Sequence, residues 1–392
     1  MVKFTAFFQF NMMRNCLKCV FLVLLLWSCS KASDPTPITS TTPPATTNPT
    51  ETPIKVSDYK NKTTNQIRLE STIWDWPIDI DITFYADIDL DGDEDIFGTK
   101  QNAKSLIKIN QAGVFTNQTI DDPNSIFIFP RSVIGNDFNG DGYIDFVVLA
   151  HNNEQINPNP GEIPSLFLNN KDKTFKVSKL DIKSAFWHLG SSADVDKDGD
   201  NDLLICTAGS IQMMLNDGSG KFTKSDQWIP NSYANCNLIG GMLEDFNGDG
   251  WMDLLVFGHE YNDLTNAPFP SKTRILFGSS SLKYAESNSL VIDSDKTGFG
   301  IVLDALYTDL NNDGKKELIL VRTGDPVNFS FYKGYKIQIL NGNTDVTASF
   351  ISNSFNKSES SINWIKVLDV NNDGKKDIVD GEKRRNIYFM MK

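Results

Sequence analysis

Six short acidic segments carry oxygen side chains at a spacing that suits a hard cation. In each segment of nine residues, positions 1, 3, 5 and 9 are Asp, Asn or Glu, and position 6 is Gly. Ca²⁺ takes six to eight oxygen ligands, and Gly allows the sharp turn that gathers them. We therefore predict up to six calcium sites, called cages 1 to 6 below. Position 7 can add a backbone carbonyl, and the position-9 carboxylate can bind through both oxygens.

The predicted ligands come from the same four positions of every cage. Cages 1 and 3 hold four acids each, whereas Asn stands at position 3 of the others, so we expect cages 1 and 3 to bind most tightly. In chain order the ligands are Asp87, Asp89, Asp91 and Asp95; Asp137, Asn139, Asp141 and Asp145; Asp194, Asp196, Asp198 and Asp202; Asp245, Asn247, Asp249 and Asp253; Asp309, Asn311, Asp313 and Glu317; and Asp369, Asn371, Asp373 and Asp377.

The flanks of the cages predict strands and not the helices of an EF-hand. An EF-hand places its bidentate acid at position 12, but that position is Gly98, Val148, Ile205, Val256, Leu320 and Asp380 in the six cages. Short apolar runs of strand length follow the loops, for example residues 146–149 and 203–206. Each cage is therefore expected to join the first and second strands of a sheet.

The cages recur at a period typical of β-propeller blades. Successive first aspartates are 50 (87 to 137) to 64 (245 to 309) residues apart. The third unit predicts four strands, at residues 186–193, 203–206, 211–215 and 221–224. We predict an all-β, six-bladed propeller. Seven blades are less favoured, because no interval holds an extra segment of about 50 residues. The last unit is short, so the strand-like residues 66–70 are expected to pair with it and close the ring.

These features resemble the FG-GAP/VCBS repeats of integrin-alpha-like β-propellers. The resemblance rests on the six cages, the strand after each, the Leu-Asn-Asp-Gly-x-Gly-x-Phe stretch that begins at Leu215, and the Phe299-Gly300 dipeptide. It covers roughly residues 65–392. The resemblance implies a calcium-stabilised, extracellular binding or adhesion module.

The segment before the repeats indicates export. Lys3, Arg14 and Lys18 precede the apolar run 20–26, which is too short to span a membrane. Residues 26–29 resemble a bacterial lipobox, so residues 1–28 are predicted to be a lipoprotein signal and Cys29 to carry the lipid; simple cleaved secretion is the alternative. The true start is Met1, Met12 or Met13. Residues 29–63 are rich in Thr and Pro and predict a disordered tether, followed by the propeller at 64–392.

Composition and charge limit the classes of partner that we expect for this protein. The formal charge of −13 argues against nucleic acid, and six calcium ions would neutralise most of it. We expect contact with a membrane only through the lipid anchor, a bacterial envelope location, and a monomer or a member of a surface complex. Cys206 and Cys236 are interpreted as buried thiols, with a disulfide as the alternative.

A ligand surface is expected on the face opposite the cages. Three long loops lie there, at residues 150–161, 258–270 and 322–332, and long loops on a rigid scaffold tend to carry recognition. Aromatic residues near these loops suit stacking on sugars, or they pack between blades. The histidines begin loops or lie on an inner strand, and because their blades are separate we predict no zinc site. The candidate ligand residues are Trp74, Trp76, Phe129, His151, Trp228, Tyr233, His259, Tyr261 and Phe331.

The sequence favours a non-enzymatic module that binds a glycan or a protein. Nucleophile-elbow, metal-hydrolase and phosphate-loop motifs are absent from the chain. Two alternatives stay open. One is a polysaccharide-active, lyase-like enzyme, since propellers host many activities. The other is a structural subunit of an envelope complex.

Overall fold

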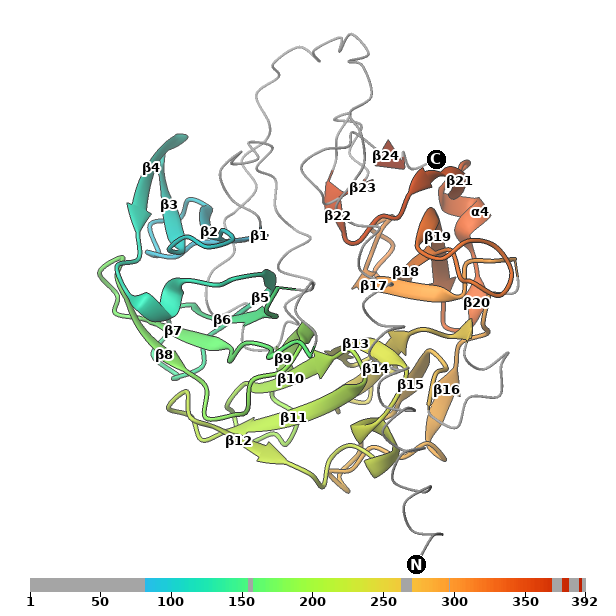
Figure 1. The fold of residues 1–392 in the computed structure, drawn as a ribbon, viewed down its shortest axis with the longest axis horizontal. Coiled ribbons are helices and arrows are strands. Elements are labelled where there is room, and N and C mark those ends of the chain that lie inside the picture. The colour runs from blue at the N-terminus through green and yellow to red at the C-terminus, as the bar shows by residue number, and fades with distance from the viewer. Residues whose placement is uncertain are drawn as a thin grey trace, which may run out of the picture.

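The protein folds into small antiparallel sheets arranged around a centre (Figure 1). The computed structural model describes residues 82–153, 158–261, 270–295, 297–368, 376–380 and 388–389. In the sheets the strands follow chain order, and each strand pairs with the next one along the chain. This arrangement is the antiparallel meander of a propeller blade.

Five sheets have the four strands of a complete blade. Their strands are, in order, β1 (Ile82–Ala86), β2 (Asp95–Thr99), β3 (Leu106–Gln111) and β4 (Val114–Thr119); β5 (Pro130–Asn136), β6 (Asp145–Ala150), β7 (Ser165–Asn169) and β8 (Phe175–Lys179); β9 (Trp187–Ala193), β10 (Asp202–Thr207), β11 (Ser210–Asn216) and β12 (Phe222–Ser225); β13 (Leu238–Glu244), β14 (Asp253–Gly258), β15 (Arg274–Leu276) and β16 (Ser289–Val291); and β17 (Ile301–Thr308), β18 (Glu317–Thr323), β19 (Lys333–Asn341) and β20 (Thr344–Asp345). These sheets are called blades 1 to 5 below.

Few elements lie outside the four-strand pattern. β21 (Phe355–Ser360) adds to blade 5 by pairing with β19. The short helix α4 (Thr347–Phe350) and the 3₁₀ turns η3 (Pro123–Ser125) and η4 (Asn231–Ala234) connect strands. In the described part of the chain, no helix is long and apolar enough to cross a membrane.

The predicted blade count is wrong, because the structure shows a five-bladed propeller and not six or seven blades. The sixth cage belongs to β22 (Ile365–Leu368), β23 (Asp377–Asp380) and β24 (Tyr388–Phe389), a three-stranded sheet that is not a complete blade. A cage marks only the turn between a first and a second strand. Counting cages therefore counts hairpins, whereas a blade also needs a third and a fourth strand.

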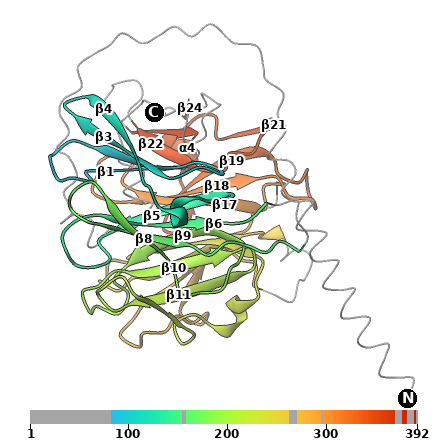
Figure 2. The same ribbon diagram turned by 60° about the vertical axis from the view of Figure 1, so that its left-hand side comes forward.

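The three-stranded sheet contacts both ends of the five-blade series. The Ile365 N–H donates to Asp304 Oδ2 of β17 at 3.3 Å, and Lys366 Nζ lies 4.2 Å from the ring centroid of Tyr85 on β1. Figures 1 and 2 place its strands between blade 5 and blade 1. The residues predicted to close the ring, 66–70, lie outside the described residues, as do the predicted signal, tether and Cys29.

The core lies between neighbouring sheets. Phe97 of blade 1 stacks on Phe146 of blade 2 with ring centroids 4.2 Å apart, inside one buried apolar cluster that spans both blades. The inner strands have no solvent-facing side, so β13 is buried at every residue. Small residues let neighbouring inner strands approach each other: a Cβ on Gly190 of β9 would lie 2.7 Å from Cδ1 of Ile134 on β5. The four strands predicted for the third unit are confirmed as β9 to β12.

Candidate metal centres and ligand surface

The first five cages lie where the sequence predicts, each between the first and second strands of a blade. Their position-6 glycines have positive φ, from 82° at Gly250 to 101° at Gly92, so a left-handed turn closes every loop. Of cage 6 only Asp377, at the start of β23, is described; Asp369, Asn371 and Asp373 lie outside the described residues.

Cages 1 and 3 bring three carboxylates together. One oxygen each from positions 1, 3 and 9 lies within 4.8 Å of the others, in Asp87, Asp89 and Asp95 and again in Asp194, Asp196 and Asp202. The position-5 acids do not join these groups, because their Oδ1 atoms accept N–H groups two residues further on. Both clusters could hold a metal ion.

A buried orphan oxygen supports a cation at these two cages. Oδ2 of Asp87 accepts the N–H of Gly92, while its Oδ1 is buried and has no hydrogen-bond partner. Asp194 repeats this arrangement with Gly199. A buried acceptor without a partner is costly. An all-oxygen donor set of this kind fits a hard cation such as Ca²⁺.

The described cages with Asn at position 3 form hydrogen bonds between their own predicted ligands. In cages 2, 4 and 5 the Asn amide donates to the position-5 carboxylate at 3.0–3.1 Å. The position-5 N–H donates to Oδ1 of position 1 at 3.1 Å, the same oxygen that is an orphan in cages 1 and 3. These internal hydrogen bonds compensate part of the negative charge without a cation. The asparagines are Asn139, Asn247 and Asn311.

The position-9 carboxylates of cages 1 to 4 tie the cage to the third strand or to the residues just after it. In cage 3, Oδ2 of Asp202 accepts the Val195 N–H at 3.1 Å, and Oδ1 accepts the Asn216 N–H of β11 at 2.8 Å. Asp95, Asp145 and Asp253 accept the equivalent pairs, and Glu317 accepts the first bond from Leu310. Sequence reasoning assigned these acids to calcium alone and missed this structural role.

Burial raises the pKa of these acids. Desolvation is the main cause, the backbone hydrogen bonds oppose it, and neighbouring cage acids add to it. The pKa rises to about 8 for Asp145 and Asp202, to about 7 for Asp95 and Asp253, and to about 6 for Asp87. Near neutral pH these sites therefore need a proton or a cation.

Replacing Asp202 by Ala is expected to destabilise the protein by about 2–6 kcal/mol. The change leaves the buried N–H groups of Val195 and Asn216 without acceptors, at about 1–3 kcal/mol each. Urea unfolding in EDTA measures this effect separately from metal binding. Asp217→Ala, at an exposed turn of the same blade, is the control. Equal stability of the two variants would contradict the structural role.

An asparagine at the end of the third strand links consecutive blades. Nδ2 of Asn169 donates to the Ile88 carbonyl in cage 1 at 3.0 Å, and Nδ2 of Asn216 donates to the Phe138 carbonyl in cage 2 at 2.8 Å. Both residues end a strand as the second member of a Leu-Asn pair, which is the sequence signal that could have revealed them. The cages of one blade are thus fixed by the next.

Lys173 of blade 2 reaches into cage 1. Its Nζ lies 2.6 Å from Asp89 Oδ2. Lys173 has φ of +69°, and the matching residue of the third unit is Gly220 with φ of +79°. Cage 1 therefore has a tethered ammonium group nearby. In the third unit the matching residue, Gly220, has no side chain, so this turn supplies no ammonium group to cage 2.

The geometry agrees with a comparison of the sequence against protein families. The model of the FG-GAP-like repeat matches residues 87–148 and 194–256. The chain carries FG-GAP-like repeats. Each matched stretch begins at the first Asp of a cage, and the two begin with cages 1 and 3, which bring their carboxylates together. No curated protein sequence matches the chain significantly.

Some solved structures are distantly similar to this chain. One is a lectin from Agrocybe aegerita that recognises non-reducing terminal N-acetylglucosamine, with 16% identity, a TM-score of 0.42, and coverage of 68% of this chain and 67% of that chain. Others are BBS1N in complex with ARL6DN, soaked with lead or mercury. Both have 9% identity, with TM-scores of 0.40 and 0.43 and coverage of 85% and 84% of this chain and 96% of that chain. These scores are too low to transfer a ligand or a partner.

The candidate ligand residues separate into two groups. Trp228 and Tyr233 are buried in an apolar cluster of blades 3 and 4, as the packing alternative expects. Phe129, Tyr261 and Phe331 are partly exposed. Trp74 and Trp76 lie outside the described residues. Cys206 and Cys236 are free and buried in the same cluster as Trp228, which confirms the interpretation as buried thiols.

Blades 2 and 3 share a stack of aromatic rings. The buried ring of His151 lies between Phe129 at 4.7 Å and Phe186 at 3.9 Å, and the His188 ring is 6.0 Å from that of His151. Burial is the main cause that lowers the pKa of His151, to about 3, and that of His188, well below its ordinary value. His151 and His188 are thus buried and neutral.

A second aromatic group spans blades 4 and 5. Nε2 of His259 lies 3.2 Å from the Tyr332 hydroxyl, and Tyr261 and Phe331 pack against the same apolar cluster as Tyr332. Within the described residues the histidines do not form a cluster with metal-ligand spacing. The loop residues 262–269 lie outside the described part.

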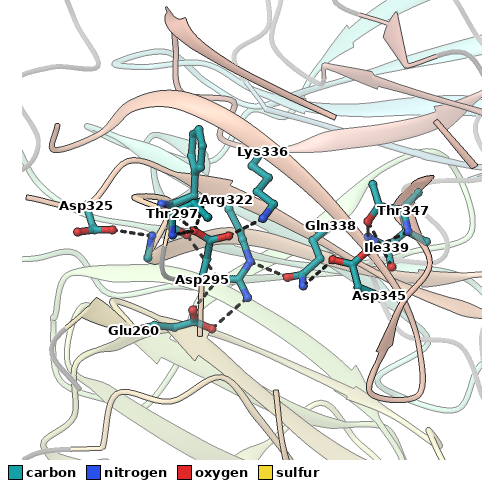
Figure 3. A network of polar contacts seen from close by, with 12 residues as sticks. Glu260, Asp295, Thr297, Arg322, Asp325, Lys336, Gln338, Ile339, Asp345 and Thr347 are labelled. Carbon is teal, nitrogen blue, oxygen red and sulfur yellow. Dashed lines mark hydrogen bonds and ion pairs between the residues drawn. The ribbon is translucent and has the colours of Figure 1, made fainter. Parts of the chain in front are cut away.

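A buried ion pair fixes the start of this loop (Figure 3). Arg322 of β18 donates from Nη1 to Glu260 Oε2 at 2.5 Å and from Nη2 to Glu260 Oε1 at 3.3 Å, and both side chains are fully buried. Arg322 Nε also donates to Gln338 Oε1 at 2.7 Å. Nearby, Asp295 pairs with Lys336. These contacts hold the segment 259–261 of blade 4 against blade 5.

Proposed function

We propose that the protein is a calcium-stabilised binding module that recognises a glycan or a protein on the face opposite the cages. The observation that carries the proposal is the pair of partly exposed aromatic groups that rigid contacts position beside the long loops. Aromatic side chains held on a rigid scaffold supply contact area at low entropic cost.

Calcium is proposed as a structural ion. Asp87, Asp89 and Asp95 would hold it in cage 1, and Asp194, Asp196 and Asp202 in cage 3. The ion would supply positive charge that permits these buried acids to ionise. Lys173 supplies part of that charge in cage 1, so cage 3 is expected to depend more on the ion. The described cages with Asn at position 3, whose ligands already form hydrogen bonds with one another, are expected to bind calcium more weakly.

The proposed location is the bacterial envelope. The basic start, short apolar run and lipobox-like ending at Cys29 support export and lipid anchoring, and residues 29–63 suit a tether. A ring held away from a lipid surface would present its loop face to external ligands.

Binding by the purified ring tests the proposal. Glycan arrays and pull-downs from envelope extracts, run in calcium and in EDTA, are expected to give a ligand in calcium. Tyr261→Ser and Phe331→Ser should weaken that binding about tenfold or more, because they remove partly exposed rings of the proposed surface. Val114→Ser removes an exposed apolar side chain from the outer strand β4 and should leave binding unchanged.

Two results would contradict this function. One is polysaccharide turnover by the purified protein, which would support the lyase-like alternative. The other is binding that survives both ring substitutions but is lost in Val114→Ser, which would move the contact surface away from the loop face.

A further inference from the structure

The inner strands of four consecutive blades carry a β-bulge at the same place. The pairing register shifts there in β5, β9, β13 and β17, and the bulged residues are Arg131, His188, Ile239 and Leu303. Each of them precedes the first Asp of its cage by six residues, as Arg131 precedes Asp137. Bulges redirect side chains and are frequent beside functional sites.

The bulged residues divide the axial end of the ring into two chemically different sides. Ile239 and Leu303 belong to the apolar cluster with Tyr332. Arg131 and His188 form the polar side, and Arg131 acts electrostatically on His188. The guanidinium Cζ of Arg131 lies 5.5 Å from the ring of Trp364, which directly precedes β22. Arg131 of blade 2 therefore extends across the axis toward the three-stranded sheet.

Among the residues that the structure describes, Arg131 has no carboxylate partner. Its guanidinium contacts the Trp364 ring and acts electrostatically on His151 and His188, and within the described part of the chain its buried Nε has no hydrogen-bond partner. Arg274, which is also partly buried, pairs with Glu286 at 3.4 Å. A partly buried guanidinium usually has such a partner.

The surroundings of Arg131 suit a flat ring that bears an anion. Trp364 and Phe186 are partly exposed, and Phe186 continues the parallel stack of His151 and Phe129. Planar faces of this kind pack against the C–H face of a sugar ring. A guanidinium presents a planar fork of donors that matches a carboxylate.

We propose that the axial end around Arg131, His188 and Trp364 binds a carboxylate-bearing sugar. Arg131 contacts the carboxylate, and Trp364 packs against the sugar ring. The inference rests on the proposed function as a binding module and names the chemical class of its ligand. An acidic peptide shares the anion but not the flat apolar ring face, so the stacked aromatic residues favour the sugar.

A glycan array that prints uronate and sialate oligosaccharides beside their methyl esters tests the inference. The full chain in calcium is expected to bind the acids and to bind the esters at least tenfold more weakly, because esterification removes the charge that Arg131 contacts. Arg131→Gln should lose the same factor toward the acids. Arg131→Lys should be intermediate, since it keeps the charge but not the fork.

Lys221→Gln is the charge-matched control. Lys221 is exposed in the turn before β12, so the variant removes one positive charge away from the axial end and should bind as the unsubstituted chain does. Circular dichroism of Arg131→Gln checks that the fold is intact.

Several outcomes would overturn the inference. The acidic-sugar assignment fails if the protein binds acids and esters equally, or if it binds none of the acids on the array. It also fails if Arg131→Gln binds the acids as the unsubstituted chain does. Arg131-dependent capture of an acidic peptide in place of a sugar would overturn it as well. Neutral-glycan or protein binding that depends on Tyr261 and Phe331 but not on Arg131 would leave the proposed function standing while the inference fails.

Discussion

In EDTA, the melting temperature of this protein is expected to fall as the pH rises from about 6.5 to 8.5. The folded-state pKa of Asp145 and Asp202 is about 8, and that of Asp95 and Asp253 about 7, above the ordinary value of 3.8. The folded state therefore holds more protons than the unfolded state in this window. Stability from such groups is present below the unfolded pKa and is lost as the pH rises through the folded pKa.

The buried histidines oppose this trend only weakly, at the lower end of the window. Their folded-state pKa is depressed, to about 3 for His151 and about 4 for His259, so they are neutral in the folded state, whereas the unfolded state, with a pKa of about 6.5, keeps them partly protonated up to about pH 7.5. Their contribution is present above the unfolded pKa of about 6.5 and is lost as the pH falls toward the folded values. The raised carboxyl groups dominate between about pH 6.5 and 8.5, and the thiols of Cys206 and Cys236, whose pKa is raised by burial, add to the loss at the alkaline end.

The expected loss is large. One pKa unit corresponds to about 1.4 kcal/mol per group, and four buried acids are affected, so the loss amounts to several kcal/mol and on the order of 10 °C in melting temperature. Saturating calcium should restore the melting temperature most strongly at the alkaline end, because the ion replaces the lost protons. Differential scanning fluorimetry measures both curves.

Cage variants make this experiment specific. Asp194→Asn changes the cage 3 acid whose Oδ1 is buried without a hydrogen-bond partner, and it should reduce the stabilisation by calcium. Asp172→Asn changes an exposed turn acid and should not. A melting temperature in EDTA that is constant or rises with pH, or one that calcium leaves unchanged, would remove the case for structural metal.

Replacing Arg322 by Met should destabilise the protein by about 3–5 kcal/mol. The change leaves the carboxylate of Glu260 buried without its partner, and breaking a buried ion pair on one side is strongly destabilising. The double variant Arg322→Met with Glu260→Leu should recover much of the loss, because no unpaired charge remains. Urea unfolding monitored by tryptophan fluorescence gives both free energies.

An exposed ion pair provides the matched comparison. Lys224 and Asp226 pair at 2.5 Å with about half or more of each side chain exposed, so Lys224→Met should change stability by less than about 1 kcal/mol. If Arg322→Met behaves like Lys224→Met, or if the double variant is no more stable than the single one, the ion pair does not hold blades 4 and 5 together in the way the geometry indicates.

The local features of this protein could be predicted because they depend on residues close together in the chain. The spacing of Asp87, Asp89 and Asp95 and the glycine at position 6 determine a loop that the structure places between β1 and β2. The expectation that cages 1 and 3 differ from the others has a counterpart in the geometry: only these two, within the described part of the chain, gather three carboxylates. Short apolar runs after the cages likewise located strands.

Features that depend on contacts between distant segments could not be predicted in the same way. The sequence shows that Asp202 has the right spacing for a ligand, but only the paired strands show that both of its oxygens accept backbone N–H groups from the loop and from β11. The same limit applies to Asn169, whose partner carbonyl belongs to the previous blade.

The sequence by itself determined the repeat, the cages and the all-β class, since each arises within one hairpin. The tertiary structure decided how many hairpins become complete blades and which side chains meet at the axis. Arg131, His151, His188 and Trp364 come from three different sheets, and the bulges that redirect two of them are visible only in the pairing register. The physical reason is that these side chains are brought together by packing between blades, which no local spacing encodes.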